Sequence, residues 1–167
     1  MKKQRGFSLI ELLIVVAIIL IIAAIAIPNL LRSRIAANEA SAVGSMRSIN
    51  TAEVTYSSTY PLVGFASDLN TLGPGSTVGS TTASSTNAIL LDSVLGCTAG
   101  VGTASCTKSG YTFAITAGTG TPLTSYTSAA SPVTVDQTGK RYFFSDASGV
   151  IRYNATTTAT SSDNPLQ

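Results

Sequence analysis

The feature that most constrains this chain is an uninterrupted apolar stretch close to its N-terminus. Residues 12–28 contain no charged or strongly polar side chain. With its flanks the apolar segment extends over about 25 residues, and at 1.5 Å per residue a helix of that length measures roughly 37 Å. This is enough to cross a hydrocarbon layer about 30 Å thick. No domain of this size can wrap a helix that is apolar on every side, which excludes a buried core helix.

Basic residues flank this stretch on both sides. Lys2, Lys3 and Arg5 precede it, whereas Arg32 and Arg34 follow it. Together with the α-amino group, the excess of positive charge before the stretch predicts that the N-terminus lies in the cytoplasm. Everything after Arg32 is then expected outside the membrane.

Two simple interpretations of the segment stay open. A secretory signal peptide would use residues 24–26 as its small-x-small cleavage site, although Glu11 interrupts the apolar stretch near its start and Pro28 closely follows that site. A plain single-span anchor leaves Glu11 unexplained, because a carboxylate inside the bilayer costs about 2.5–3.5 kcal/mol on insertion scales.

The composition argues against several classes of protein. The 167 residues include no His and two Cys, and the formal net charge is +2. A structural zinc site needs four ligands, and a Ser-His-Asp or Cys-His catalytic apparatus needs a histidine. A charge this small also gives no reason to infer contact with nucleic acid. We therefore expect no enzyme activity, no cofactor and no bound metal.

The first residues carry a family resemblance. The run Lys2-Lys3-Gln4-Arg5-Gly6 followed by Phe7-Ser8-Leu9-Ile10-Glu11-Leu12-Leu13 resembles the N-terminus of a type IV prepilin. Pro28 also lies in the apolar helix, where this family usually has a proline. The resemblance covers about the first 30 residues. It is shared by pilins, minor pilins and the pseudopilins of type II secretion.

The resemblance implies specific roles for four residues. A prepilin peptidase should cleave between Gly6 and Phe7 and methylate the new amine of Phe7. Glu11 should pair with the Phe7 amine of a neighbouring subunit and set the register of a growing filament; the alternative is an acid at the membrane interface. Pro28 should bend the helix, because it removes one backbone hydrogen bond. Cleavage would remove three of the ten Lys and Arg residues, leaving seven against eight Asp and Glu.

The helical pattern continues beyond the apolar stretch but becomes amphipathic. We expect one helix over residues 8–60, which ends before Pro61 because proline biases the preceding residue away from helix. Its second half has an apolar stripe made of Ile35, Val43, Met46, Ile49 and Tyr56. Arg34, Glu39, Arg47 and Glu53 are expected to lie off this stripe. The predicted divisions are a leader (1–6), a transmembrane or filament-core helix (7–34), an amphipathic half-helix (35–60) and a globular head (61–167).

Within the head, residues 61–110 predict mostly irregular structure, because they are dense in Ser, Thr and Gly. The apolar segment 88–95 favours a short helix, with a buried strand nearly as well supported. Residues 154–167 are expected to form a frayed polar tail.

Residues 111–153 predict an antiparallel sheet of about four strands. Residues 111–116 alternate, with Tyr111, Phe113 and Ile115 on one face. Residues 122–129 form a second expected strand with Leu123 pointing inward, and segments 141–145 and 150–153 predict a hairpin. The expected fold class is α+β, with the long helix packed against this sheet.

Cys97 and Cys106 are expected to form a disulfide, because paired cysteines outside the cytoplasm usually oxidise. Closing so short a loop stabilises the fold by about 2.7 kcal/mol in the chain-entropy model. Two free thiols are the alternative. Many type IV pilins carry such a bridge near the C-terminus, and here it lies earlier. Asp146, with Ser148 and Gly149, is interpreted as an ordinary turn rather than a cation site.

The function implied by the resemblance is structural. The chain would be inserted in the inner membrane as a prepilin, trimmed, and polymerised into an extracellular pilus for adhesion, twitching motility or DNA uptake. Its partners would be other copies of itself, the prepilin peptidase and methylase, assembly ATPases, a platform protein and a secretin. The alternatives are a pseudopilin of type II secretion and a membrane-anchored binding domain that does not polymerise.

Overall fold

The computed structural model describes residues 8–75, 82–97 and 105–166. The chain divides into two compact units, residues 1–34 and 35–167. We call the first the N-terminal unit and the second the head. The long helix α1 (Leu9–Thr59) begins in the N-terminal unit and ends in the head. The expected helix over residues 8–60 is thus confirmed to within one residue at each end.

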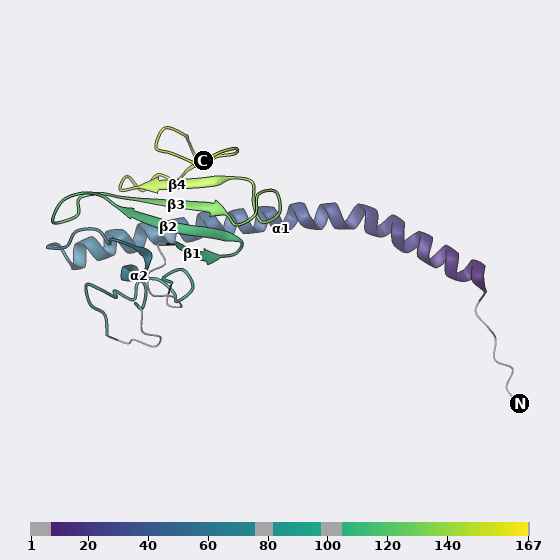
Figure 1. The fold of residues 1–167 in the computed structure, drawn as a ribbon, viewed down its shortest axis with the longest axis horizontal. Helices are drawn as coiled ribbons and strands as arrows, with labels where there is room; N and C mark the ends of the chain where they lie inside the picture. The colour runs from purple at the N-terminus through teal and green to yellow at the C-terminus, as the bar shows by residue number, and fades with distance from the viewer. Residues whose placement is uncertain (1–7, 76–81, 98–104, 167) are drawn as a thin grey trace, which may run out of the picture. The chain divides into compact units, whose positions relative to one another are not determined.

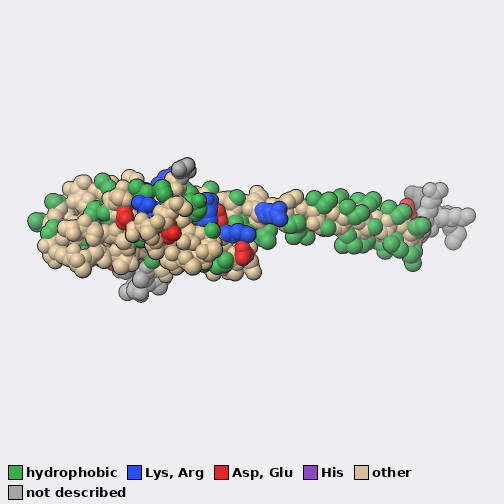
Figure 2. Space-filling model, turned by 90° about the horizontal axis from the view of Figure 1, so that it is seen from above, with side chains coloured by type: hydrophobic (Ala, Val, Ile, Leu, Met, Phe, Trp, Pro, Cys, Tyr) green, Lys and Arg blue, Asp and Glu red, His purple; other side chains and the backbone are tan. Residues whose placement is uncertain are grey.

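In the N-terminal unit, α1 is exposed and apolar on every side. All sixteen Leu, Ile and Val side chains between positions 9 and 31 are exposed to solvent. Figure 2 shows hydrophobic side chains covering this part of the helix. By length and composition, α1 is the one helix of the described residues that can cross a membrane, with a mean hydropathy of 3.3 over its most apolar window.

In the head, α1 buries one stripe with alternating steps of four and three residues. Its members are Ile35, Glu39, Ala42, Met46, Ile49, Glu53 and Tyr56. This spacing keeps the stripe on one side of a 3.6-residue helix. The expectation that Glu39 and Glu53 lie off the stripe is wrong. Both carboxylates are buried, because polar groups of the head reach them.

The sheet has six strands in a simple antiparallel meander, so each strand pairs with the next one along the chain. The strands are β1 (Ser105–Lys108), β2 (Tyr111–Ala117), β3 (Tyr126–Pro132), β4 (Tyr142–Asp146), β5 (Arg152–Asn154) and β6 (Asn164–Pro165). In Figure 1 the labelled strands lie against the second half of α1. The α+β class is confirmed, although about four strands were expected.

One row of residues shows how the sheet forms the core. Cys106, Phe113, Ala130, Phe143 and Tyr153 are directly paired on successive strands. The first four are at most 4% exposed, and Tyr153 packs against the same core. The predicted alternation of Tyr111, Phe113 and Ile115 is confirmed, because all three side chains are buried in β2.

Two expectations about the second half of the head are wrong. The strand expected at 122–129 lies at Tyr126–Pro132, and its buried face carries Tyr126, Ser128 and Ala130. Leu123 precedes the strand and is half-buried, because its backbone pairs with Val63 and Phe65 instead.

The tail at 154–167 is not frayed over its described residues. It contains β6, which pairs with β5, and Ala159 is only 3% exposed. The carboxylate of Asp163 holds this segment by accepting hydrogen bonds from the N–H of Thr160 and the amide of Asn154.

The segment 88–95 is neither helix nor strand. It lies beside the short helix α2 (Leu69–Leu72), which begins at the N-cap Asp68. Three of its N–H groups donate to the carbonyls of Thr71 and Leu72 at the end of α2, namely those of Ala88, Leu90 and Leu91. Ile89 between them has a φ of 55°, outside both helix and strand. These three N–H groups bond to carbonyls at the end of α2, so they cannot form the hydrogen bonds of a helix or strand within segment 88–95.

Candidate functional site

The site expected at the N-terminus centres on Glu11 in the first turn of α1. Its carboxylate accepts a hydrogen bond from the Ser8 backbone N–H, at 3.4 Å, and its side chain is exposed. Ser8 and Glu11 are thus spaced as in a capping box, in which the acid at the third helical position satisfies a free N–H at the helix start. Sequence reasoning missed this contact, although the Ser-x-x-Glu pattern before an apolar run was there to indicate it. Gly6 and Phe7 lie outside the described residues.

Pro28 lies within the helical part of the N-terminal unit. The helix continues through it. Since proline has no N–H, the carbonyl four residues earlier, that of Ala24, receives no hydrogen bond from position 28. A bend at this point stays a prediction.

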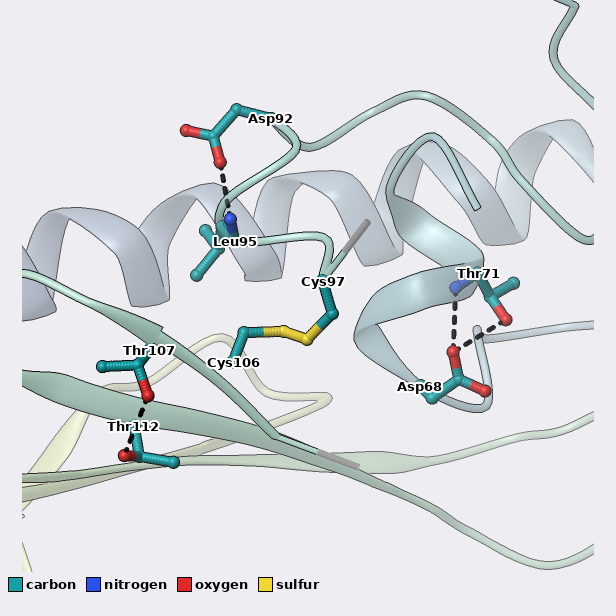
Figure 3. Close-up of a disulfide and its surroundings, with 8 residues drawn as sticks. All are labelled: Asp68, Thr71, Asp92, Leu95, Cys97, Cys106, Thr107 and Thr112. Carbon is teal, nitrogen blue, oxygen red and sulfur yellow. Dashed lines mark hydrogen bonds between the residues drawn. A yellow bond between two sulfur atoms is a disulfide. The ribbon is translucent and has the colours of Figure 1, made fainter. Parts of the chain in front are cut away.

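The head contains the predicted disulfide. Cys97 is bonded to Cys106, and their Cα atoms lie 5.4 Å apart. Figure 3 shows the bridge joining the turn that ends at Cys97 to strand β1. Asp92 adds a second link, because its carboxylate accepts hydrogen bonds from the Leu95 N–H and from Lys108 Nζ, each at 2.6 Å. Burial raises the pKa of Asp92, but these hydrogen bonds outweigh it and the pKa is lowered.

Glu39 links α1 to the two residues that immediately precede β4. Its carboxylate accepts hydrogen bonds from the N–H groups of Lys140 and Arg141, at 2.9 and 3.2 Å. It also accepts one from Arg141 Nε at 2.8 Å. Burial raises the pKa of Glu39, but these donors more than compensate, so the pKa lies below its ordinary value. The Arg141 guanidinium lies over the rings of Phe143 and Tyr153 at 5.6 and 5.5 Å, which holds it in place.

Glu53 is buried with fewer hydrogen-bond donors than Glu39 has. It is 0% exposed, and its Oε2 accepts one hydrogen bond, from the Ala66 N–H at 2.8 Å. Its Oε1 has no hydrogen-bond partner among the described residues. Burial raises the pKa of Glu53 to about 7, the Ala66 N–H opposes this, and the nearby Asp68 charge adds to it. Glu39 and Glu53 therefore occupy equivalent positions on one stripe, but the pKa of Glu39 is lowered whereas that of Glu53 is raised.

The remaining side chains provide little chemistry. Within the part of the chain that the structure describes, no three His, Cys, Asp or Glu side chains are grouped to hold a metal ion. Asp146 closes a turn, in which its side chain accepts a hydrogen bond from the Ser148 N–H and its carbonyl accepts one from Gly149. The interpretation of this segment as a turn agrees with that geometry. The notable features of the chain are therefore an exposed apolar helix and a head that contains an internal disulfide.

An apolar helix long enough to cross a membrane, together with a separately packed unit, is typical of membrane-anchored proteins, and comparisons with known proteins refine the class. Residues 1–27 match the family model described as the prokaryotic N-terminal methylation motif. The match contains Gly6, Phe7 and Glu11, and it reaches the residue before Pro28.

Two curated relatives share the N-terminal region. The chain is 62% identical over 39 residues to the type IV wide pilus major component PilA4 of Thermus thermophilus, which covers 23% of this chain and 30% of that protein. It is 45% identical over 54 residues to the type IV major pilin protein PilA of Myxococcus xanthus, covering 32% and 24%. The chain therefore aligns with less than a third of either relative's length. No solved structure gives a significant match. The motif and the two relatives support a type IV pilin, a subunit of a pilus.

Proposed function

We propose that this chain is a structural subunit that polymerises through the N-terminal half of α1 into an extracellular type IV pilus. In this proposal the prepilin sits in the inner membrane with its N-terminus in the cytoplasm. A prepilin peptidase removes residues 1–6 and methylates Phe7. The fibre then serves adhesion, twitching motility or DNA uptake, and the chain itself catalyses no reaction.

The observation that carries the proposal is the N-terminal methylation motif on a fully exposed apolar helix. Sixteen exposed aliphatic side chains cannot stay in water, so they need either lipid or copies of the same helix. A subunit that moves from membrane to fibre exchanges one apolar surrounding for the other. The head, with its own core, stays in water in both states.

Glu11 is proposed to pair with the Phe7 amine of a neighbouring subunit. In an apolar filament core such a pair attracts strongly, and an unpaired charge left there costs several kcal/mol. The capping contact with Ser8 is a competing role, because a carboxylate that only caps its own helix would not specify the position of a neighbour.

Two substitutions separate these roles. Glu11→Gln keeps an oxygen for the Ser8 N–H but removes the charge, whereas Glu11→Ala removes both. We expect both variants to reach the membrane at normal levels, because removing a charge from the apolar helix favours insertion into the bilayer. We expect both to lose most fibres, which are measured by shearing cells that carry the variant as the sole copy.

Each alternative has a distinct result. If Glu11→Gln forms fibres as well as wild type and only Glu11→Ala fails, the acid acts as a cap. Wild-type fibre yield from both variants would contradict any role of Glu11 in assembly. Absence of fibres from the wild-type chain, in cells that assemble other pilins, would overturn the proposed function itself.

A further inference from the structure

We propose that Arg32 and Arg34 bind the headgroup phosphates of anionic phospholipids at the outer surface of the membrane. The inference rests on the proposed function, since it concerns the subunit while it is still inserted in the bilayer. It assigns the two arginines the task of setting how deep α1 lies before a subunit enters the fibre.

The two arginines are uncompensated charges. Both side chains are exposed, and neither has an ion pair or hydrogen bond among the described residues. No acidic residue occurs between Glu11 and Glu39 in the sequence, so no carboxylate on this stretch of α1 can neutralise them. A guanidinium in this situation is free to bind an anion, and its planar fork matches phosphate well.

Their position along α1 matches the depth of a phosphate layer. From Leu9 to Leu31 the helix rises about 33 Å, close to the roughly 30 Å of a hydrocarbon core. When the aliphatic side chains of this segment lie in lipid, Arg32 follows directly at the level of the headgroups. Long arginine side chains extend along the bilayer surface to reach such groups.

The angle between the two arginines favours lipid over a protein partner. Residues two apart on a helix are separated by about 200°, so Arg32 and Arg34 point to nearly opposite sides of α1. One acidic protein surface cannot meet both guanidinium groups at once. A layer of headgroups surrounds the helix completely and therefore meets both. The partner chemistry is accordingly the phosphate of an anionic lipid.

The experiment uses the full chain in a mild detergent. Equal amounts of phosphatidylglycerol and phosphatidylcholine are added, and bound lipids are counted by native mass spectrometry. We expect phosphatidylglycerol to be retained in preference, and the preference to fall about fivefold for each arginine replaced in Arg32→Gln and Arg34→Gln. Arg32→Lys with Arg34→Lys should keep most of the preference, because the charges remain.

Arg47 provides the matched control. It is also an exposed arginine on α1 with no ion pair among the described residues, but it lies fifteen residues beyond Arg32, within the head. Arg47→Gln should therefore retain phosphatidylglycerol as wild type does. An equal loss in Arg47→Gln, or equal retention of both lipids by wild type, would overturn the inference.

A further measurement distinguishes binding of a lipid headgroup from binding of free inorganic phosphate. Excess inorganic phosphate should leave the bound phosphatidylglycerol in place, and displacement would mean that the arginines bind a free anion instead. Fibre formation by wild type is scored separately. Normal fibres without lipid preference contradict this inference alone, whereas lipid preference without fibres contradicts the proposed function alone.

Discussion

The buried carboxyl group of Glu53 should make the head less stable as the pH rises. The pKa of Glu53 is raised from an ordinary 4.5 to about 7, because burial removes the carboxylate from water. The folded head thus binds a proton that the unfolded chain releases at a lower pH. The destabilisation of the folded head by Glu53 is absent below pH 4.5, grows as the pH rises towards 7, and is constant above pH 7.

The size of the effect follows from the difference between the two pKa values. One pH unit of such a difference corresponds to about 1.4 kcal/mol, so ionised Glu53 destabilises the folded head by about 3 kcal/mol in alkaline solution. Glu53 interacts with three nearby titratable groups, of which only Asp68 shifts its pKa. Asp68 raises the pKa of Glu53, while the Glu53 charge contributes to the raised pKa values of Tyr56 and Tyr126. Among the residues that the structure describes, no cationic side chain contributes to the pKa shift of Glu53.

Glu53→Gln provides the measurement. The glutamine oxygen can still accept the hydrogen bond from Ala66, but the side chain no longer ionises. Burying the amide has a cost that does not depend on pH. The informative quantity is therefore the difference in unfolding free energy between variant and wild type, measured as a function of pH. We expect this difference to move by about 2 to 3 kcal/mol in favour of the variant between pH 5 and pH 8. Urea denaturation of the head, residues 35–167, followed by circular dichroism, measures it.

Glu39→Gln is the matched control, because Glu39 lies on the same stripe with the opposite pKa shift. Three donors from Lys140 and Arg141 stabilise its charge, so its contribution to stability is present above its unfolded pKa and is lost on acidification through the folded pKa. The variant should be less stable than wild type at pH 8 and approach it as the pH falls. If the Glu53→Gln and wild-type stability curves run parallel from pH 5 to 8, the reasoning about Glu53 is refuted.

Two further predictions concern covalent chemistry. The mature chain should begin at a methylated Phe7, and the intact mass of subunits from sheared fibres measures this; a mass that retains residues 1–6, or a start at Ile27, contradicts it. Replacing Cys97 and Cys106 together by serine should lower the unfolding free energy of the head by about 3 kcal/mol in urea denaturation. An unchanged midpoint would show that the bridge adds no stability.

Much of the fold could be predicted where a local pattern repeats. Residues 8–60 indicate a long helix, because the apolar stretch and the 3.6-residue pattern follow one another without a break until Pro61. The alternation in 111–116 and the turn between Asp146 and Gly149 indicate strands for the same local reason. The pairing of Cys97 with Cys106 needed only a short loop and an oxidising compartment.

The errors arise where distant contacts decide the structure. Glu39 and Glu53 have the spacing of core positions, but a carboxylate is interpreted as exposed unless its partners are known, and those partners lie in other elements. The sequence misplaces strand β3 because two of its buried residues are small: Ala130 lies between Phe113 and Phe143, and Ser128 lies between Ile115 and Ser145. The alternation signal for a strand depends on large apolar residues at every second position, and in β3 Tyr126 is followed by the small Ser128 and Ala130.

The meander order of the sheet has a consequence for the order in which the head folds. Because every strand pairs with its neighbour in sequence, hairpins can form one after another over short chain distances. Contacts between α1 and the sheet are far less local, since the Asn50 amide donates a hydrogen bond to Ser145 of β4, 95 residues away. Contacts between distant residues form more slowly than local ones. The sheet should therefore form its hairpins before α1 docks, although α1 is the first part of the head to be synthesised.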